Sequence, residues 1–159
     1  MKESYSALGS ESILIPRRSP EERKKNFIIA TNKKIKEYMK NGGVGDLDLE
    51  GTPITSLPEG LIVGGDLDLY KTSITSLPKG LKVGGYLDLY GTFITSLSEG
   101  LTVGSWLDLS KTPLSKKNSS KELKRMAPGV KGHIILRNES QKNWAWVYLD
   151  GSATISYTV

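Results

Sequence analysis

Acidic side chains recur at 20-residue intervals in the middle of this 159-residue chain. The most regular column is Asp48, Asp68, Asp88 and Asp108; the column two residues earlier is Asp46, Asp66, Tyr86 and Trp106, and the column two residues later is Glu50, Tyr70, Tyr90 and Ser110. A row of fixed carboxylates next to Tyr and Trp has the composition of a surface that binds a basic protein.

A binding surface is one of two interpretations of these columns. Carboxylates about 5 Å apart on adjacent repeats repel each other by roughly 1 kcal/mol per neighbour even in water, so Ser, Thr or Lys would suit a purely structural face better. We expect the four aromatic side chains to rim one side of the acidic row. The alternative is that duplication copied a tolerated Asp, or that the Asp side chains bond local turns. The predicted binding residues are Asp46, Asp48, Asp66, Asp68, Tyr70, Tyr86, Asp88, Tyr90, Trp106 and Asp108.

Motifs for catalysis and for metal binding are missing from the sequence. The chain has no Cys, and its single His, His133, is expected to be a structural residue of a strand. Neither a Ser-His-Asp set, a P-loop nor a metal-spaced His cluster is present. We therefore predict that the protein is not an enzyme and needs no cofactor. The run Gly-Gly-Asp-Leu-Asp has Leu where calcium-binding β-helix repeats need Gly, so no dedicated Ca²⁺ site is expected, although divalent cations could bridge the Asp row weakly.

Trp144, Trp146 and Tyr148 share one face of a predicted strand. Such a face could stack on sugars or on bases. The favoured interpretation is that the three side chains form the core of a hairpin packed on the end of the repeats.

The acidic columns belong to a repeat that runs from Gly45 to Leu114. Its three full copies read GDLDLEGTPITSLPEGLIVG, GDLDLYKTSITSLPKGLKVG and GYLDLYGTFITSLSEGLTVG, and a fourth copy stops after SWLDLSKTPLS. Six aliphatic columns persist through the copies. Repetition at a fixed period of about 20 to 50 residues is typical of a solenoid, in which each unit buries its apolar face against its neighbours.

Within each copy, alternation with period 2 predicts a half-buried strand in the run V-G-G-D-L-D-L-Y. Val63, Leu67 and Leu69 should face the core, while the Asp positions face outward. A turn, a second short extended piece (I-T-S-L-P) and a Gly turn should follow. Because no piece is long enough for a helix, we predict a mainly β solenoid of about three and a half coils.

The repeat resembles leucine-rich-repeat proteins, particularly the short bacterial type with 20-residue units and an L-P step. The family pattern L-x-x-L-x-L-x-x-N-x-L-x-x-L-P maps onto Leu67, Leu69, Ile74, Leu77 and Pro78. Thr replaces the family's Asn at position 72, and Gly replaces its first Leu at position 64. The variant L-D-L-x-G-T-x-I-T-S-L-P also looks like repeats of bacteriophage and gut-bacterial proteins. The resemblance covers less than half of the chain and implies a short leucine-rich-repeat-like solenoid.

The segments on both sides of the repeats are expected to cap the solenoid. We predict a flexible leader over residues 1–18, a capping helix over 19–43, the solenoid over 44–115 and a C-terminal cap over 116–159. The helix signal is Ser19 as N-cap, followed by Pro20 and by Glu22 three residues after the cap.

The C-terminal cap should contain a polar linker from Lys116, a short helix over Lys121–Met126 capped by Ser120, and three strands. The predicted strands are His133–Arg137, Trp144–Leu149 and Ala153–Val159, with a hairpin turn at Asp150-Gly151. These strands either cover the far end of the solenoid or form a small separate lobe.

The net charge of +5 conceals a segregation of charge along the chain. Residues 1–43 carry 10 Lys/Arg against 5 Asp/Glu, residues 44–112 carry 4 against 9, and residues 113–159 carry 8 against 3. Basic flanks permit nucleic-acid binding, although lysines without interleaved aromatics more often form a solvated face. No apolar run reaches the roughly 20 residues of a membrane span, so we expect no membrane partner and a cytoplasmic location.

The predicted function is a non-catalytic module that binds a protein with a basic surface through the acidic and aromatic strand face. The resemblance to phage repeats implies a sharper form, an inhibitor of a host defence protein that acts in the host cytoplasm. The alternative function is nucleic-acid binding by the basic flanks.

Overall fold

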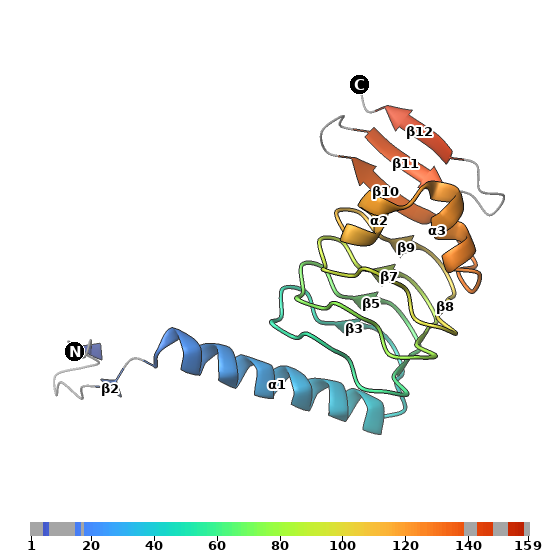
Figure 1. Ribbon diagram of the computed structural model, residues 1–159. Helices are drawn as coiled ribbons and strands as arrows, with labels where there is room; N and C mark the ends of the chain where they lie inside the picture. The colour runs from blue at the N-terminus through green and yellow to red at the C-terminus, as the bar shows by residue number, and fades with distance from the viewer. Residues whose placement is uncertain (1–4, 7–14, 17, 139–142, 148–152, 158–159) are drawn as a thin grey trace.

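The computed structural model describes residues 5–6, 15–16, 18–138, 143–147 and 153–157, with side chains from residue 18 to residue 136. The chain is a β-solenoid with one long helix at its N-terminal end and a set of strands at its C-terminal end (Figure 1). Most of the predicted leader lies outside the described residues. Its described parts are β1 (Tyr5–Ser6) and β2 (Ile15–Pro16), which pair antiparallel.

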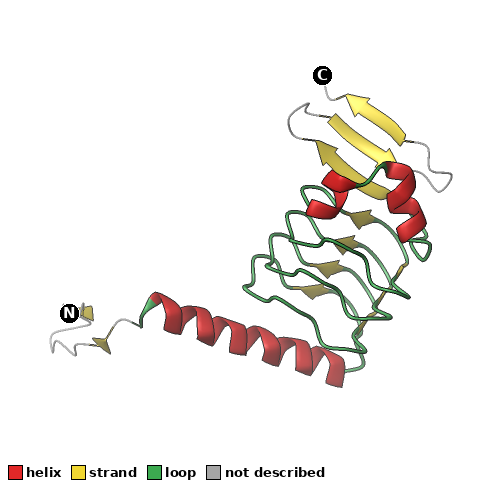
Figure 2. Cartoon of the chain, in the orientation of Figure 1, coloured by secondary structure: helices red, strands yellow, loops and turns green. Residues whose placement is uncertain are grey.

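Two stacks of two-residue parallel strands run along the solenoid, and the rest of each coil is loop (Figure 2). The first stack pairs residues 20 positions apart, with Leu opposite Leu and Asp opposite Asp. It consists of β3 (Leu47–Asp48), β5 (Leu67–Asp68), β7 (Leu87–Asp88) and β9 (Leu107–Asp108). The second stack consists of β4 (Ile62–Val63), β6 (Lys82–Val83) and β8 (Thr102–Val103). The predicted mainly β solenoid is confirmed.

The strand predicted from Val63 to Tyr70 is broken by a bend at Gly64 and Gly65. The two halves are the strands β4 and β5, which belong to different sheets. A Cβ at Gly84, one coil later, would lie 2.1 Å from the Gly64 carbonyl oxygen, so the corner brings successive coils too close for any side chain. The extended piece I-T-S-L-P is also not a strand in these coils, and it lies on the connection from the first stack to the second.

The aliphatic columns form one continuous core. Leu67, Leu69, Leu87 and Leu89 are fully buried, as the alternation predicts. The Thr column lies beside them, and the Thr72 hydroxyl donates to the Leu69 carbonyl oxygen at 2.9 Å. The equivalent Thr of the other coils makes the same bond. The Thr column therefore closes a turn inside each coil and makes no bridge between coils through this hydroxyl.

Helix α1 (Pro20–Lys40) covers the first coil with its C-terminal half only. Its start is as predicted, because the Ser19 side chain accepts from the Glu22 N–H at 3.1 Å. Thr31 and Ile35 are buried, and Tyr38 and Met39 pack against the core. The N-terminal half overhangs the solenoid (Figure 1) and leaves large apolar side chains exposed, namely Phe27 and Ile29.

The fourth coil does not stop after Leu114 but continues through two short helices. These are α2 (Pro113–Lys117) and α3 (Ser120–Met126), and Val130 then bridges to Val103. The predicted linker from Lys116 is wrong, because α2 includes Lys116 and Lys117. The predicted N-cap is one residue late: Ser119 caps α3 in a capping box with Glu122.

Strand β10 (Ile134–Asn138) completes this coil by pairing parallel with β9, with Ile134 opposite Leu107. The coil is thus 27 residues long where the others have 20. Strands β11 (Asn143–Val147) and β12 (Ala153–Tyr157) follow antiparallel in the same sheet. The C-terminal strands therefore prolong the sheet of the solenoid. The side chains of Trp144, Trp146 and Tyr148, and the Asp150-Gly151 turn, lie outside the described residues.

Candidate functional site

Four aspartates lie on one face of the first sheet, and we name Asp48, Asp68, Asp88 and Asp108 the acidic ladder. Strand register places each of them opposite the next, as predicted. Their exposure falls along the stack: Asp48 is exposed, Asp68 and Asp88 are half-buried, and Asp108 is 0 % exposed. The expectation that every rung faces solvent is wrong for Asp108, because β10 lies beside it and pairs the buried Ile135 with it.

Every rung of the ladder bonds the backbone of its own coil. One carboxylate oxygen, Oδ1, accepts from the N–H group two residues later, which is an Asx turn. The bonds are Asp48 to Glu50 N (2.9 Å), Asp68 to Tyr70 N (2.8 Å), Asp88 to Tyr90 N (2.7 Å) and Asp108 to Ser110 N (2.7 Å). The interpretation in which Asp side chains bond local turns is therefore confirmed as far as these bonds go. These bonds explain why each of the four positions has a side chain with a hydrogen-bond acceptor.

Asp46 and Asp66, in the neighbouring column, connect one coil to the next. Asp46 Oδ1 accepts from Asp66 N at 2.8 Å, and Asp66 Oδ1 accepts from Tyr86 N at 2.6 Å. A Cβ at Gly85 would lie 2.0 Å from Asp66 Oδ1, so the bond requires Gly in the following coil. The sequence contains this signal, since Gly follows each of these Asp by 19 residues, whereas Ser105 follows Tyr86.

The aromatic side chains lie on both sides of the ladder, so the prediction that they rim one side is wrong. Tyr70 and Tyr90 follow the Asp of their coil and stack with ring centroids 4.9 Å apart. Tyr86 and Trp106 precede it. The Tyr86 hydroxyl donates toward Asp88 Oδ2 at 3.3 Å and lies 3.5 Å from Asp108 Oδ2. Tyr90 is 6 % exposed and Trp106 is 43 % exposed, so of these two only Trp106 offers substantial area to a partner.

Two lysines that the sequence interpretation did not include also belong to this surface. The Lys71 ammonium lies 4.9 Å from the centre of the Tyr70 ring, and the Lys111 ammonium lies 5.3 Å from that of Tyr90. Both lysines have positive φ, at a turn position that Gly fills in the other two coils. The alternation of Gly and Lys at this position is the sequence signal for them.

The environment of Asp88 changes the acidity of its carboxyl group. Its burial raises its pKa from 3.8 to about 6, and the negative charges of Asp108 and Asp68 add to this. The bonds from Tyr90 N and the Tyr86 hydroxyl act in the opposite direction and hold the pKa down. A charge at this rung is therefore costly to keep, and near pH 6 Asp88 is about half protonated.

Other features of the described residues lie away from the ladder. Two ion pairs join described side chains, Lys33–Glu37 and Lys79–Glu99, and both are elsewhere on the surface. Among residues with described side chains, no group of three or more His, Asp or Glu is arranged to hold a metal ion. None of the helices in the described part of the chain is both long and apolar enough to cross a membrane.

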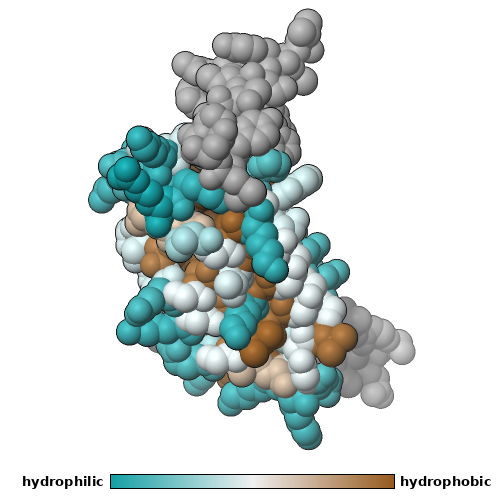
Figure 3. Space-filling model, turned by 90° about the vertical axis from the view of Figure 1, so that its right-hand side faces the viewer, coloured by the Kyte–Doolittle hydropathy of each residue, from teal (hydrophilic) through white to brown (hydrophobic). Residues whose placement is uncertain are grey.

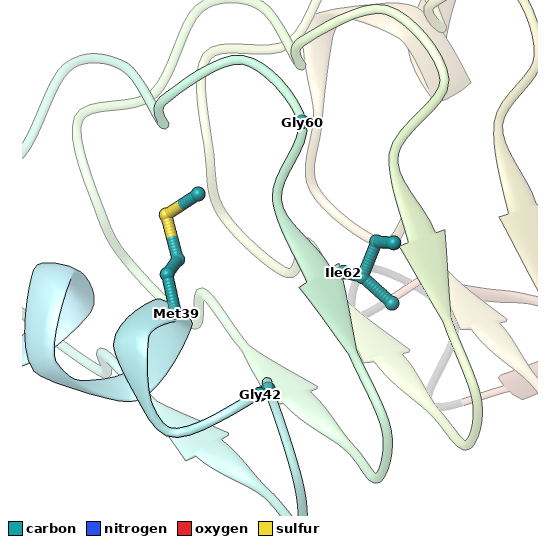
Figure 4. Close-up of a pocket in the computed structure, with 5 residues that line it drawn as sticks. Met39, Gly42, Gly60 and Ile62 are labelled. Carbon is teal, nitrogen blue, oxygen red and sulfur yellow. The ribbon is translucent and has the colours of Figure 1, made fainter.

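Two hollows lined by described residues open on other parts of the surface. The smaller, of about 150 Å³, lies where α1 meets the coil: Met39 and Ile62 flank it, and Gly42 and Gly60 form part of its wall (Figure 4). The larger, of about 520 Å³, lies between the third coil and α3, with Glu99 and Arg125 among its lining residues. On the side of the solenoid that carries β8, hydrophobic residues form a narrow band bordered by polar ones (Figure 3). Neither hollow contains a residue of the ladder.

Comparisons of this chain with protein-family models, with curated proteins and with solved structures find no match.

Proposed function

We propose that the acidic ladder and its neighbours bind a basic segment of a protein. The supporting observation is that each rung needs only an oxygen acceptor for its turn, and the amide oxygen of Asn would accept the same N–H. The negative charge is therefore not required by the fold. It also carries a cost, as the raised pKa of Asp88 indicates. Charged side chains at positions where a neutral acceptor would serve the turn equally well support a role in recognition.

The contacting part of the surface is narrower than the sequence pattern alone indicates. Asp46, Asp48 and Asp66 are exposed, and Asp68 and Asp88 are half-buried. Asp108 and Tyr90 are buried, so a partner would not contact them directly. Trp106 is the best candidate for an apolar anchor, because large aromatic residues beside polar groups dominate binding energies.

The protein acts by binding and not by catalysis in this proposal. Its repeat is assigned to the leucine-rich-repeat type on resemblance. The phage-like variant of that repeat supports the narrower proposal of an inhibitor whose target is a basic host defence protein.

The test compares two ligands of opposite charge, a poly-lysine peptide and a short DNA duplex, by calorimetry. Asp48→Asn with Asp68→Asn keeps both turn bonds but removes two charges, so poly-lysine affinity should fall about tenfold. Asp48→Lys with Asp68→Lys should abolish that binding. If DNA bound by the basic flanks is the true ligand, the Lys variant should instead bind DNA more tightly, because repulsion of phosphates is removed.

A matched control keeps the number of charges removed constant. Glu59→Gln with Glu99→Gln removes two exposed carboxylates outside the ladder and should leave poly-lysine affinity within about twofold of wild type. Equal loss in the control and in the Asn variant would mean that only net charge matters, and the proposal of a defined surface would be wrong.

A further inference from the structure

The exposed side of α1 carries a basic stripe made of Lys25, Ile29, Lys33, Lys36 and Lys40. These residues follow one another at steps of three or four, so they share one side of the helix. All five are exposed, and they lie on the side of the helix away from the buried Thr31 and the half-buried Tyr38. At 1.5 Å per residue the stripe is about 22 Å long.

The stripe does not lie along the acidic ladder of its own chain. Ile35 is buried in the core, and the Tyr38 hydroxyl lies 2.8 Å from the Gly43 carbonyl oxygen and 2.6 Å from that of Gly45. The Lys34 ammonium donates to the Asp48 carbonyl oxygen. These contacts hold α1 across the end of the coil stack, and the helix extends beyond it (Figure 1).

The stripe and the ladder match in charge and in spacing. Residues 18–40 contain 8 Lys/Arg and 3 Glu, whereas the repeats contain more acids than bases. Lysines three or four residues apart on a helix advance about 4.5 to 6 Å along its axis, and the rungs of a parallel stack are about 4.8 Å apart. If the helix lies along the solenoid axis, Lys33, Lys36 and Lys40 therefore come near three successive rungs. Ile29, which is 56 % exposed, supplies an apolar contact within the stripe.

We propose that the basic stripe of one copy of this chain docks on the acidic ladder of a second copy. This inference rests on the proposed function and names its partner. Each copy carries both surfaces, so two copies can pair reciprocally about a twofold axis, or copies can join head-to-tail into a longer assembly. In both arrangements the association increases with protein concentration. Salt weakens it by screening the charges.

The experiment measures the mass of the full-length, nuclease-treated protein by sedimentation over a hundredfold range of concentration that spans micromolar affinities. At about 50 mM salt the mean mass should rise with concentration, and at about 500 mM salt it should return to that of a monomer. The stripe variant, Lys25→Glu with Lys33→Glu and Lys36→Glu, should stay monomeric. The ladder variant, Asp48→Lys with Asp68→Lys, should also stay monomeric.

Mixing these two variants gives the decisive result. The acidic stripe of the first variant then matches the basic ladder of the second. The native stripe of the second variant also matches the native ladder of the first, so association should return. Circular dichroism checks that each variant is folded. The control, Lys79→Glu with Lys82→Glu and Lys121→Glu, reverses three exposed lysines outside α1 and should associate as wild type does.

The outcomes separate this inference from the proposed function. Wild-type protein that stays monomeric at low salt, or a mixture of folded variants that does not associate, overturns the inference. If such a protein still binds poly-lysine through the ladder, the proposed function stands with another partner. If it binds no poly-lysine, both proposals fall. If the mean mass rises only when a DNA duplex is added, and the stripe variant shows no such rise, the stripe binds nucleic acid. This result also overturns the inference.

Discussion

At the scale of single residues, the aspartates of the repeats have two structural roles, and each role uses a different hydrogen bond. Rungs such as Asp68 close a turn within one coil, whereas Asp66 connects two coils. The second role imposes a condition on another residue, because Gly85 must leave room for the Asp66 oxygen. The pairing of Asp with a later Gly is thus a physical rule of this repeat.

The first prediction tests that rule. Gly85→Ala places a methyl group against Asp66 Oδ1 and should lower the free energy of unfolding by about 1 to 3 kcal/mol, measured by urea denaturation. Ser105→Ala changes the equivalent position, where the preceding coil has Tyr86, and should cost less than about 0.5 kcal/mol. In an Asp66→Ala background the Gly85→Ala cost should shrink. A cost that is unchanged in that background would show that the carboxylate is not what excludes the side chain.

The second prediction concerns Asp88 and pH. Its pKa of about 6 in the folded chain lies above the ordinary 3.8, so between those values the folded state retains a proton that the unfolded state has released. The ionised carboxyl therefore destabilises the fold above about pH 6, and this destabilisation disappears as the pH falls through the interval toward 4. Because the side chain is half-buried and partly screened, we expect about 1 to 2 kcal/mol.

Asp88→Asn removes this dependence while its amide oxygen still accepts from Tyr90 N. Its free energy of unfolding should exceed that of wild type at pH 7 and approach it near pH 4, measured by denaturation at a series of pH values. Glu59→Gln, an exposed change elsewhere, should keep the wild-type dependence on pH. If the Asn variant keeps it as well, Asp88 is not its source.

At the scale of elements, the sequence predicts well what depends on periodicity and poorly what depends on close approach between coils. The buried columns and the start of α1 at Ser19 follow from local pattern. The break at Gly64 and Gly65 does not, because alternation continues through it and the close approach of the previous coil is not visible in the sequence. The burial of Asp108 likewise depends on β10, which arrives after an insertion that the 20-residue period does not contain.

Helix α1 shows the same limit, since its apolar residues do not reveal where the solenoid beneath them ends. The third prediction uses two isoleucines of this helix. Ile35→Ala should cost about 2 to 4 kcal/mol, because the side chain is 2 % exposed and part of the core. Ile29→Ala, at 56 % exposure, should change stability by no more than about 0.5 kcal/mol. Thermal denaturation of both variants measures the difference, and equal costs would contradict the half-covered geometry of α1.

At the scale of the whole molecule, one core connects elements from three of the four segments into which the sequence divides the chain. Ile35 of α1, the Leu columns, Leu123 of α3 and Ile134 of β10 belong to the same cluster of buried side chains. In a solenoid each coil contacts only its neighbours, so stability is close to a sum of coil and interface contributions. A stack this short should still unfold as one unit, provided that the fourth coil is joined as firmly as the others.

The last prediction tests that condition with one variant in the centre and one at the C-terminal junction. Leu87→Ala and Ile134→Ala each truncate a side chain that is 0 % exposed, so each should cost about 2 to 5 kcal/mol. Both should lower the midpoint of the same single transition, whether it is followed by calorimetry or by circular dichroism. If Ile134→Ala instead splits off a separate transition and leaves the main one in place, the C-terminal strands unfold independently. The pairing of β10 with β9 would then be too weak to make the prolonged sheet one cooperative structure.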